Sequence, residues 1–213
     1  MDLIYPTLIN GAVFDLNRNS PVWDRLFKRI GEKMKIALLL ANGFEETEAL
    51  LPLDFLRRAG ADIDTIGIGG KEITGAHGIT IITELCDRCA MPDAYDAVIF
   101  PGGMPGAINL DSSEFTDKII DAVFAKGGRL AAICAAPLIL GRRGLLRGKK
   151  ATCYPGFEKE LLGAEVLSAG VVTDGLITTA KGMGVAMEFA KELTTLIFGN
   201  ETMQKIASSI MEA

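Results

Sequence analysis

The sequence is poor in cysteine and histidine and has no long apolar run, and each shortage excludes a class of protein. Four cysteines in a chain of 213 residues that is 49% hydrophobic are too sparse for a disulfide scaffold, so we expect them reduced. No run approaches the ~20 apolar residues that span a bilayer, and the first residues lack the basic region and apolar core of a signal peptide. We therefore expect a cytoplasmic protein that does not contact membranes.

Positive charge is also scarce, because the formal net charge is -5 at pH 7. That balance provides no general attraction for the nucleic-acid backbone or for an anionic membrane surface. We expect neither as a partner.

The chain divides by pattern into an N-terminal extension, residues 1–33, and a main domain, residues 34–213. In the extension, Ser20 and Pro21 have the order of a helix N-cap followed by proline at the first helical position. Apolar residues at helical spacing follow: Trp23, Leu26, Phe27 and Ile30. They predict a short amphipathic helix ending near Gly31. We expect its apolar stripe to cover the main domain or a second subunit, unless Met34 is the true start of translation.

Strand and helix patterns alternate through the main domain. Residues 35–40 form a continuous apolar strand, typical of a parallel sheet covered by helices on both faces. Further strands are predicted at 63–68, 79–83, 97–100, 150–152, 171–173 and 176–179, and one ends just before Cys134. Helices are predicted at about 45–59, 114–126, 185–198 and 201–210. The alternation predicts an α/β fold, a doubly wound sandwich with a mostly parallel sheet, and ligands bind such sheets at the carboxyl ends of their strands.

Cys134 is the strongest candidate for chemistry. It ends a buried-looking strand, and a helix is expected to begin there at once, with small residues on both sides that permit the sharp turn of a nucleophile elbow. The helix dipole would help this thiol to ionise near neutral pH. Alternatively, Cys134 is a small apolar residue at the end of a core strand.

Glu48 stands out among the three carboxylates of the loop at residues 42–48. Dipole complementation in a first helical turn explains Glu45 and Glu46. Pro52, however, cannot donate the helical hydrogen bond to the Glu48 carbonyl. A kink there would tip the Glu48 carboxyl group toward a neighbouring strand end.

Glycines dominate the loop at residues 101–106, which follows another core strand. They permit close approach of the backbone. Amides of this loop and of Cys134 can therefore form the two halves of an oxyanion hole.

Taken together, these segments resemble the DJ-1/PfpI/ThiJ superfamily, in the branch that contains the Parkinsonism-associated protein deglycase. The matching segments are Gly43-x-Glu45-Glu46-x-Glu48, Pro101-Gly102-Gly103, Ala131 to Pro137, and Lys181-Gly182-Met183-Gly184. The resemblance covers about residues 34–198 and implies a flavodoxin-like fold and a homodimer.

The resemblance also implies roles for individual residues. Cys134 is the nucleophile, and Glu48 is a protonated carboxyl group that hydrogen-bonds its sulfur. The anion site consists of the backbone amides of Gly103, Cys134 and Ala135. Around this pocket lie Glu45, Gly102, Tyr154 and His77.

The chain departs from the family pattern in its histidines. Many members carry histidine at the position of Tyr154, whereas the one histidine here, His77, precedes Cys134 in a glycine-flanked turn. We expect His77 to be a solvated turn residue, unless it reaches the site of a partner subunit near the dimer interface. Ala135 stands where peptidase-like members have histidine, so proteolysis is not expected. The His-x-Glu of class I glutamine amidotransferases is also absent.

The other cysteines carry weaker signals. Cys86 and Cys89 form one Cys-x-x-Cys without a second pair, which is a poor zinc site and does not open a clear helix as a redox dithiol would. We expect no metal. Cys153 could resolve an oxidised Cys134, but strand alternation points it the other way.

These residues favour a cofactor-independent enzyme of the glyoxalase or deglycase type, with Cys134 as nucleophile and Glu48 as acid and base. The expected substrate is a small aldehyde or a glycated group. The alternative is an oxidative-stress sensor or chaperone-like protein that works through oxidation of Cys134 to sulfinate. A structural domain with a vestigial elbow is the third interpretation.

Overall fold

The computed structural model describes residues 8–9, 12–13 and 34–211. The chain divides into two compact units, Met1–Lys33 and Met34–Ala213. In the first unit, strands β1 (Leu8–Ile9) and β2 (Ala12–Val13) pair antiparallel. The amphipathic helix predicted near residues 20–31 lies outside the described residues.

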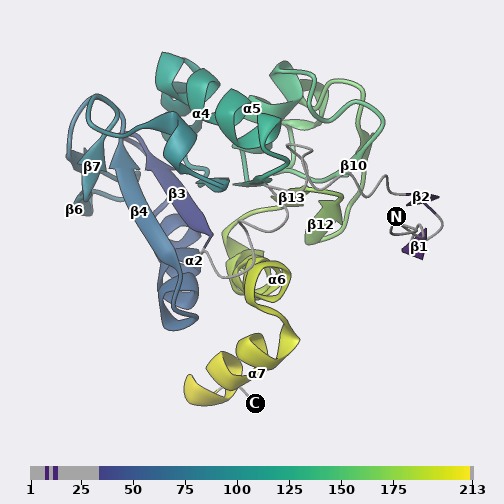
Figure 1. The fold of residues 1–213 in the computed structure, drawn as a ribbon. Helices are drawn as coiled ribbons and strands as arrows, with labels where there is room; N and C mark the ends of the chain where they lie inside the picture. The colour runs from purple at the N-terminus through teal and green to yellow at the C-terminus, as the bar shows by residue number, and fades with distance from the viewer. Residues whose placement is uncertain (1–7, 10–11, 14–33, 212–213) are drawn as a thin grey trace, which may run out of the picture. The chain divides into compact units, whose positions relative to one another are not determined.

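The second unit is built on a seven-stranded sheet with the order β12-β13-β9-β8-β3-β4-β7 (Figure 1). Its strands are β3 (Lys35–Leu40), β4 (Asp62–Gly67), β7 (Leu85–Cys86), β8 (Ala97–Phe100), β9 (Arg129–Ile133), β12 (Val171–Asp174) and β13 (Ile177–Ala180). The β12–β13 pair is antiparallel, and the other neighbours are parallel. The predicted α/β sandwich with a mostly parallel sheet is confirmed.

Helices cover both faces of this sheet, because successive strand residues point to opposite faces and both faces are apolar. The helices are α2 (Glu46–Arg58), α3 (Gly106–Asp111), α4 (Glu114–Ala125), α5 (Pro137–Arg142), α6 (Ala186–Phe198) and α7 (Asn200–Ser209). Leu39 and Val98 pack with the core beneath α3, α4 and α5, whereas Leu38 and Ile99 pack with the core beneath α2 and α6. Helix α7 adds Ile206 to a smaller cluster with α2 and α6.

Several short elements lie outside the central sheet. An antiparallel hairpin joins β5 (Glu72–Thr74) to β6 (Thr80–Ile82), and β10 (Lys150–Ala151) pairs with β11 (Glu165–Val166). Three 3-10 turns are η1 (Pro92–Ala94), η2 (Glu158–Glu160) and η3 (Met183–Val185). The strand predicted at 79–83 therefore belongs to a hairpin. The central sheet ends instead on β7, which the sequence pattern does not predict.

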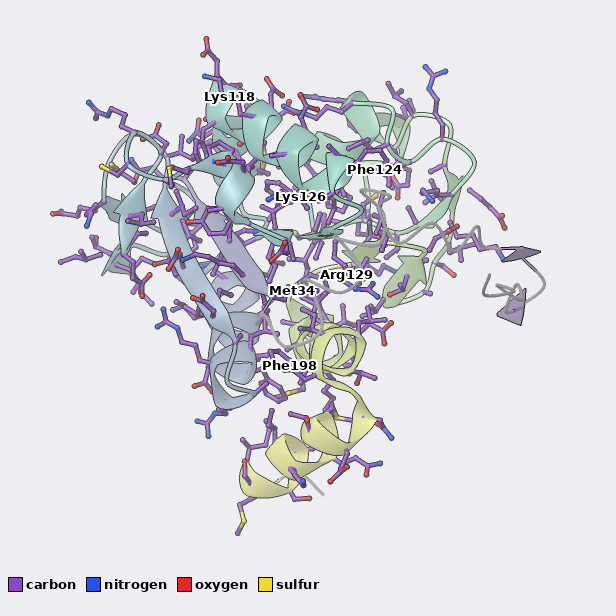
Figure 2. The ribbon with its side chains drawn as sticks, in the orientation of Figure 1. Met34, Lys118, Phe124, Lys126, Arg129 and Phe198 are labelled. Atoms are coloured by element: carbon purple, nitrogen blue, oxygen red, sulfur yellow. The ribbon has the colours of Figure 1, made fainter. Side chains whose placement is uncertain are left out.

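The strand order brings together the loops that carry the site. After β3 the chain crosses to β4 on one side, and it later returns to β8 on the other side of β3. The loops that follow β3 and β8 therefore diverge, and ligands bind at such switch points. Because β9 is the next strand along, Cys134 reaches the same carboxyl edge. Figure 2 labels Met34 and Arg129, which mark the amino ends of β3 and β9, at the opposite edge of the sheet.

Candidate active site

Cys134 sits in a sharp turn at the end of β9. Its φ is +65°, in the left-handed region that residues with a side chain rarely adopt. Its N–H donates to the Ala180 carbonyl oxygen (2.9 Å), and its carbonyl oxygen accepts from the Tyr154 N–H (2.8 Å). Strand β13 and the segment after β10 thus hold the residue in the strained conformation typical of functional turns. The helix does not begin at Cys134 as expected, because residues 134–136 form a turn and α5 begins at Pro137.

Gly102 and Gly103 lie against the Cys134 turn. A Cβ on Gly102 would stand 2.5 Å from the Cys134 Cβ and 2.6 Å from Glu48 Oε2. Gly103 has a φ of +87°, and a Cβ there would stand 2.3 Å from the Glu45 backbone nitrogen. Only glycine allows so close an approach in both places. The loop therefore brings its backbone N–H groups directly to Cys134 and Glu48.

Glu48 is a buried carboxyl group, 1% exposed, at the start of α2. Its Oε2 accepts from the Gly102 N–H (3.0 Å), its carboxyl group also accepts from the Met183 N–H, and it hydrogen-bonds the Cys134 thiol. Burial raises the pKa of Glu48 to about 7, and the negative charge of Glu45 acts in the same direction. Protonated and ionised Glu48 are therefore both populated near neutral pH.

The ionisation of Cys134 depends on Glu48. Burial, followed by the charge of an ionised Glu48, raises the pKa of Cys134 to about 12, against the opposing effect of the Gly103 and Ala135 N–H groups. When Glu48 is protonated its repulsion disappears, and its O–H can donate to the sulfur. The N–H groups favour the thiolate in either state of Glu48, but they act without its opposing charge only when Glu48 is protonated. Burial and the charge of Glu48, rather than the predicted helix dipole, therefore have the largest effects on the pKa of this thiol.

Two backbone N–H groups converge on the Cys134 sulfur, those of Gly103 and Ala135. The N–H of Cys134, which the family resemblance assigns to the same anion site, instead donates to Ala180. The reason is the sheet register, since Ala180 of β13 pairs with Ile133 of β9. An anion site at this position consists of Gly103 and Ala135 without the Cys134 amide.

Glu45 and Tyr154 lie at the edge of the site. Glu45 caps α2, because its Oε2 accepts from the Glu48 N–H (2.6 Å). Tyr154 is 51% exposed. A Cβ on Gly182 would lie 3.4 Å from the Tyr154 ring and 3.8 Å from Glu48 Oε1, so the ring and the carboxyl group border the same space.

His77 pairs with Glu46 rather than with Cys134. Glu46 is buried and accepts from the His77 backbone N–H (2.8 Å), and its Oε2 lies 2.7 Å from His77 Nδ1. This contact raises the pKa of the exposed His77 imidazole. Burial alone would raise the pKa of Glu46, but the hydrogen bonds from His77 and Ile79 outweigh burial and lower it. The pair ties the β5–β6 hairpin to the start of α2.

Among the described residues, one group of three side chains has ligand atoms close enough together to hold a metal ion. Ligand atoms of Glu45, Glu46 and His77 lie within 4.8 Å of one another. Each of the two carboxylates already accepts hydrogen bonds, so we assign no metal to them.

Cys153 and Cys134 pack into different hydrophobic cores. Cys153 is 4% exposed in the core beneath α3, α4 and α5, whereas Cys134 packs against the core beneath α2 and α6. Burial raises the pKa of Cys153 to about 11. A resolving role for Cys153 is inconsistent with this placement.

Two backbone groups contribute to the site that the sequence does not predict. The Met183 N–H binds the Glu48 carboxyl group, and the Ala180 carbonyl oxygen binds the Cys134 N–H. Met183 belongs to the Lys181–Gly184 segment that carries the family resemblance, but a backbone donor leaves no signature in residue identity. The Ala180 contact depends on the register of β13, and Met183 lies in η3, which follows that strand.

Comparison with known proteins gives consistent matches for the main domain. The model of a family described as the DJ-1/PfpI family matches residues 34–196. Protein dj-1beta of Drosophila melanogaster is 32% identical over 179 residues, which cover 83% of this chain and 96% of the fly protein. A deglycase of Pyrococcus abyssi is 32% identical over 77% of this chain and 99% of its own length. The structure of oxidized Toxoplasma gondii DJ-1 superposes with a TM-score of 0.80 at 31% identity, covering 84% of this chain and 99% of that one.

None of the helices in the described residues combines the length and apolar character needed to cross a membrane.

Proposed function

The chain belongs to the DJ-1/PfpI family, and from that premise we propose that it is a cysteine enzyme of the deglycase or glyoxalase type, acting on reactive carbonyls without a cofactor. The proposed substrate is a small aldehyde or a glycated group. One observation carries the proposal. The buried carboxyl group of Glu48, with a pKa of about 7, hydrogen-bonds the Cys134 sulfur beside two backbone N–H groups.

Addition to the aldehyde is the first step for a small dicarbonyl such as methylglyoxal. Ionised Glu48 takes the proton of the Cys134 thiol as the sulfur forms a bond to the aldehyde carbon, and the electron pair of the C=O double bond moves to oxygen. The N–H groups of Gly103 and Ala135 stabilise that negative oxygen, and protonated Glu48 delivers the proton that completes the hemithioacetal. Glu48 is now a carboxylate and can act as a base.

Rearrangement and hydrolysis follow. The Glu48 carboxylate removes the proton from the carbon bonded to sulfur and returns it to the neighbouring carbon, while the hydroxyl proton of the hemithioacetal passes to the former ketone oxygen. The first carbon is thereby oxidised to a thioester and the second is reduced to an alcohol. Water hydrolyses the thioester, releases the 2-hydroxy acid and restores the thiol. The sum consumes one water and requires no external oxidant.

The residues around Cys134 do not favour cleavage of peptide bonds. The single histidine of the chain is His77, and it is bonded to Glu46. An amine leaving group would therefore lack the imidazole that usually protonates it.

The test is conversion of methylglyoxal to lactate by the purified protein, measured by NMR. We expect Cys134→Ala to abolish product and Glu48→Gln to reduce kcat at least about a hundredfold, the low end of general acid–base contributions. Cys89→Ser, which removes an exposed thiol outside the site, is the matched control and should retain wild-type activity. Product formation by the wild type no faster than by Cys134→Ala would refute the proposal.

A sensor based on Cys134 oxidation is the second candidate. A protonated Glu48 carboxyl group and two N–H groups are donors suited to a sulfinate, and one structural neighbour carries the description oxidized. If the protein is such a sensor, mild peroxide should oxidise Cys134 before it oxidises Cys86, Cys89 and Cys153. The four cysteines lie in four different tryptic fragments, so peptide mass spectrometry reads each separately. Equal oxidation of all four would exclude the sensor.

A further inference from the structure

Cys86 and Cys89 lie at the free edge of the central sheet, where β7 ends (Figure 1). Cys86 pairs with Gly67 of β4, and the Asp87 N–H donates to the Gly67 carbonyl oxygen (3.0 Å). The chain then turns back, since the N–H groups of Cys89 and Ala90 both donate to the Cys86 carbonyl oxygen (2.9 and 3.0 Å). The strand pairing and the turn together hold the two thiols in one place.

The two sulfur atoms are already in contact, with Sγ atoms 3.2 Å apart. A disulfide bond is about 2.05 Å long, so closure requires side-chain movement of about 1 Å. Cys89 is exposed and Cys86 is partly exposed. A small molecule can therefore reach the pair from solvent.

The two thiols differ in acidity. Their shared hydrogen bond lowers the pKa of Cys86 and raises that of Cys89, and the backbone N–H groups of Arg88 and Cys89 also lower the pKa of Cys86. Cys86 therefore ionises first, while Cys89 retains the proton. A redox dithiol usually relies on a helix N-terminus for this effect. Here the N–H groups of a turn supply it, because neither cysteine lies at the start of a helix.

The pair is independent of the candidate active site. Four strand spacings, about 19 Å at ~4.8 Å each, separate β7 from β9 and hence from Cys134. Two thiols are also too few for a structural zinc site, which takes four ligands. Among the described side chains, the one cluster suited to a cation does not include either cysteine.

We propose that Cys86 and Cys89 form a reversible dithiol–disulfide site that exchanges with small-molecule disulfides, with Cys86 as the attacking thiol and Cys89 as the resolving thiol. Cys86 thiolate attacks one sulfur of the small disulfide, forms a mixed disulfide and releases one thiolate, which takes up a proton. Cys89, losing its proton to solvent, then attacks the Cys86 sulfur and releases the second small thiol. The protein loses two electrons and two protons, and the small disulfide becomes two thiols.

Trypsin provides a direct readout, because Arg88 lies between the two cysteines. Reduced protein yields separate fragments ending at Arg88 and beginning at Cys89, whereas a Cys86–Cys89 disulfide keeps them joined. The Cys134→Ala protein is equilibrated with oxidised and reduced glutathione, blocked with iodoacetamide and digested. We expect the joined fragment to rise with the proportion of oxidised glutathione and to vanish with excess reductant. Its absence at every ratio would overturn the proposal.

Single variants test the two roles. Cys89→Ser should accumulate a persistent mixed disulfide on Cys86, because the resolving thiol is missing. Cys86→Ser should form its mixed disulfide on Cys89 several-fold more slowly at pH 7 than Cys89→Ser forms one on Cys86, because the Arg88 and residue 89 backbone N–H groups stabilise only the Cys86 thiolate. Equal rates in the two variants would refute the assignment of roles. Methylglyoxal turnover by either variant should equal that of wild type, so failure of this site and failure of the proposed activity are distinguishable.

Discussion

Glu48 is a carboxyl group whose ionisation opposes folding. Its native pKa of about 7 lies above its ordinary value near 4.5, so the folded protein holds a proton that the unfolded chain releases between these values. The stability from this protonation is fully present below pH 4.5 and is lost as the pH rises through 7. At ~1.4 kcal/mol per pKa unit, ionised Glu48 costs the folded state up to about 3 kcal/mol.

Glu48→Gln should therefore stabilise the protein in a pH-dependent way. We expect unfolding free energies within about 0.5 kcal/mol of wild type at pH 5, where Glu48 is protonated, and a gain of about 1–3 kcal/mol at pH 8. Urea unfolding at both pH values measures the difference. Glu72→Gln, at an exposed position, serves as control and should show little change at either pH. A Glu48→Gln effect of equal size at pH 5 and pH 8 would contradict this account.

At the scale of elements, the first turn of α2 both positions Glu48 and sets its charge. Glu45 contributes in two separable ways, since its carboxylate accepts from the Glu48 N–H (2.6 Å) and its charge raises the pKa of the Glu48 side chain. Removing the cap should loosen the turn that presents Glu48 to Cys134. Removing the charge alone should leave the turn in place.

Two substitutions separate these contributions. Glu45→Ala removes the cap and should cost about 1 kcal/mol of stability, measured by urea unfolding. Glu45→Gln keeps an acceptor oxygen without the charge, so it should retain most of that stability and lower the pKa of Glu48. The lower pKa appears as a shift of the pH–kcat profile to lower pH. Equal destabilisation by both variants, with unmoved profiles, would show that Glu45 acts in neither way.

Elements with long, uniform patterns could be predicted from the sequence, and short ones could not. Strand β3 is recognisable because both of its faces are buried, which makes it continuously apolar. By contrast, β7 has two residues and α3 has six, too few to show a period.

In the site, likewise, residue types could be predicted from the sequence and backbone contacts could not. Cys134, Glu48 and the loop glycines are visible as residue types, but the bond from the Cys134 N–H to Ala180 depends on the register of β13 against β9. No pattern of side chains specifies that register. The Cys86–Cys89 turn was similarly hidden, because backbone N–H groups there take the place of a helix terminus.

At the scale of the whole molecule, strand order assembles the site from distant segments. The loops after β3 and β8 and the turn after β9 begin at residues 41, 101 and 134, and the order β3-β8-β9 makes them neighbours. A change in the order of these three strands would separate Glu48 from Cys134 without altering either residue. The site is therefore a property of the topology as much as of its side chains.

The homodimer implied by the family resemblance should form through the β5–β6 hairpin. Ile79 is 53% exposed and Ile82 is 80% exposed, so the hairpin presents apolar surface that a second copy would cover. Ile82→Glu places a charge in that contact and should weaken the dimer at least tenfold, as measured by size-exclusion chromatography with light scattering over a dilution series. Leu162→Glu, at a 48% exposed leucine in another part of the surface, is the matched control and should remain dimeric. A monomeric wild type, or an Ile82→Glu dimer as tight as wild type, would exclude this interface. His77, which lies in the turn of the same hairpin, would then have no route to the site of a partner subunit.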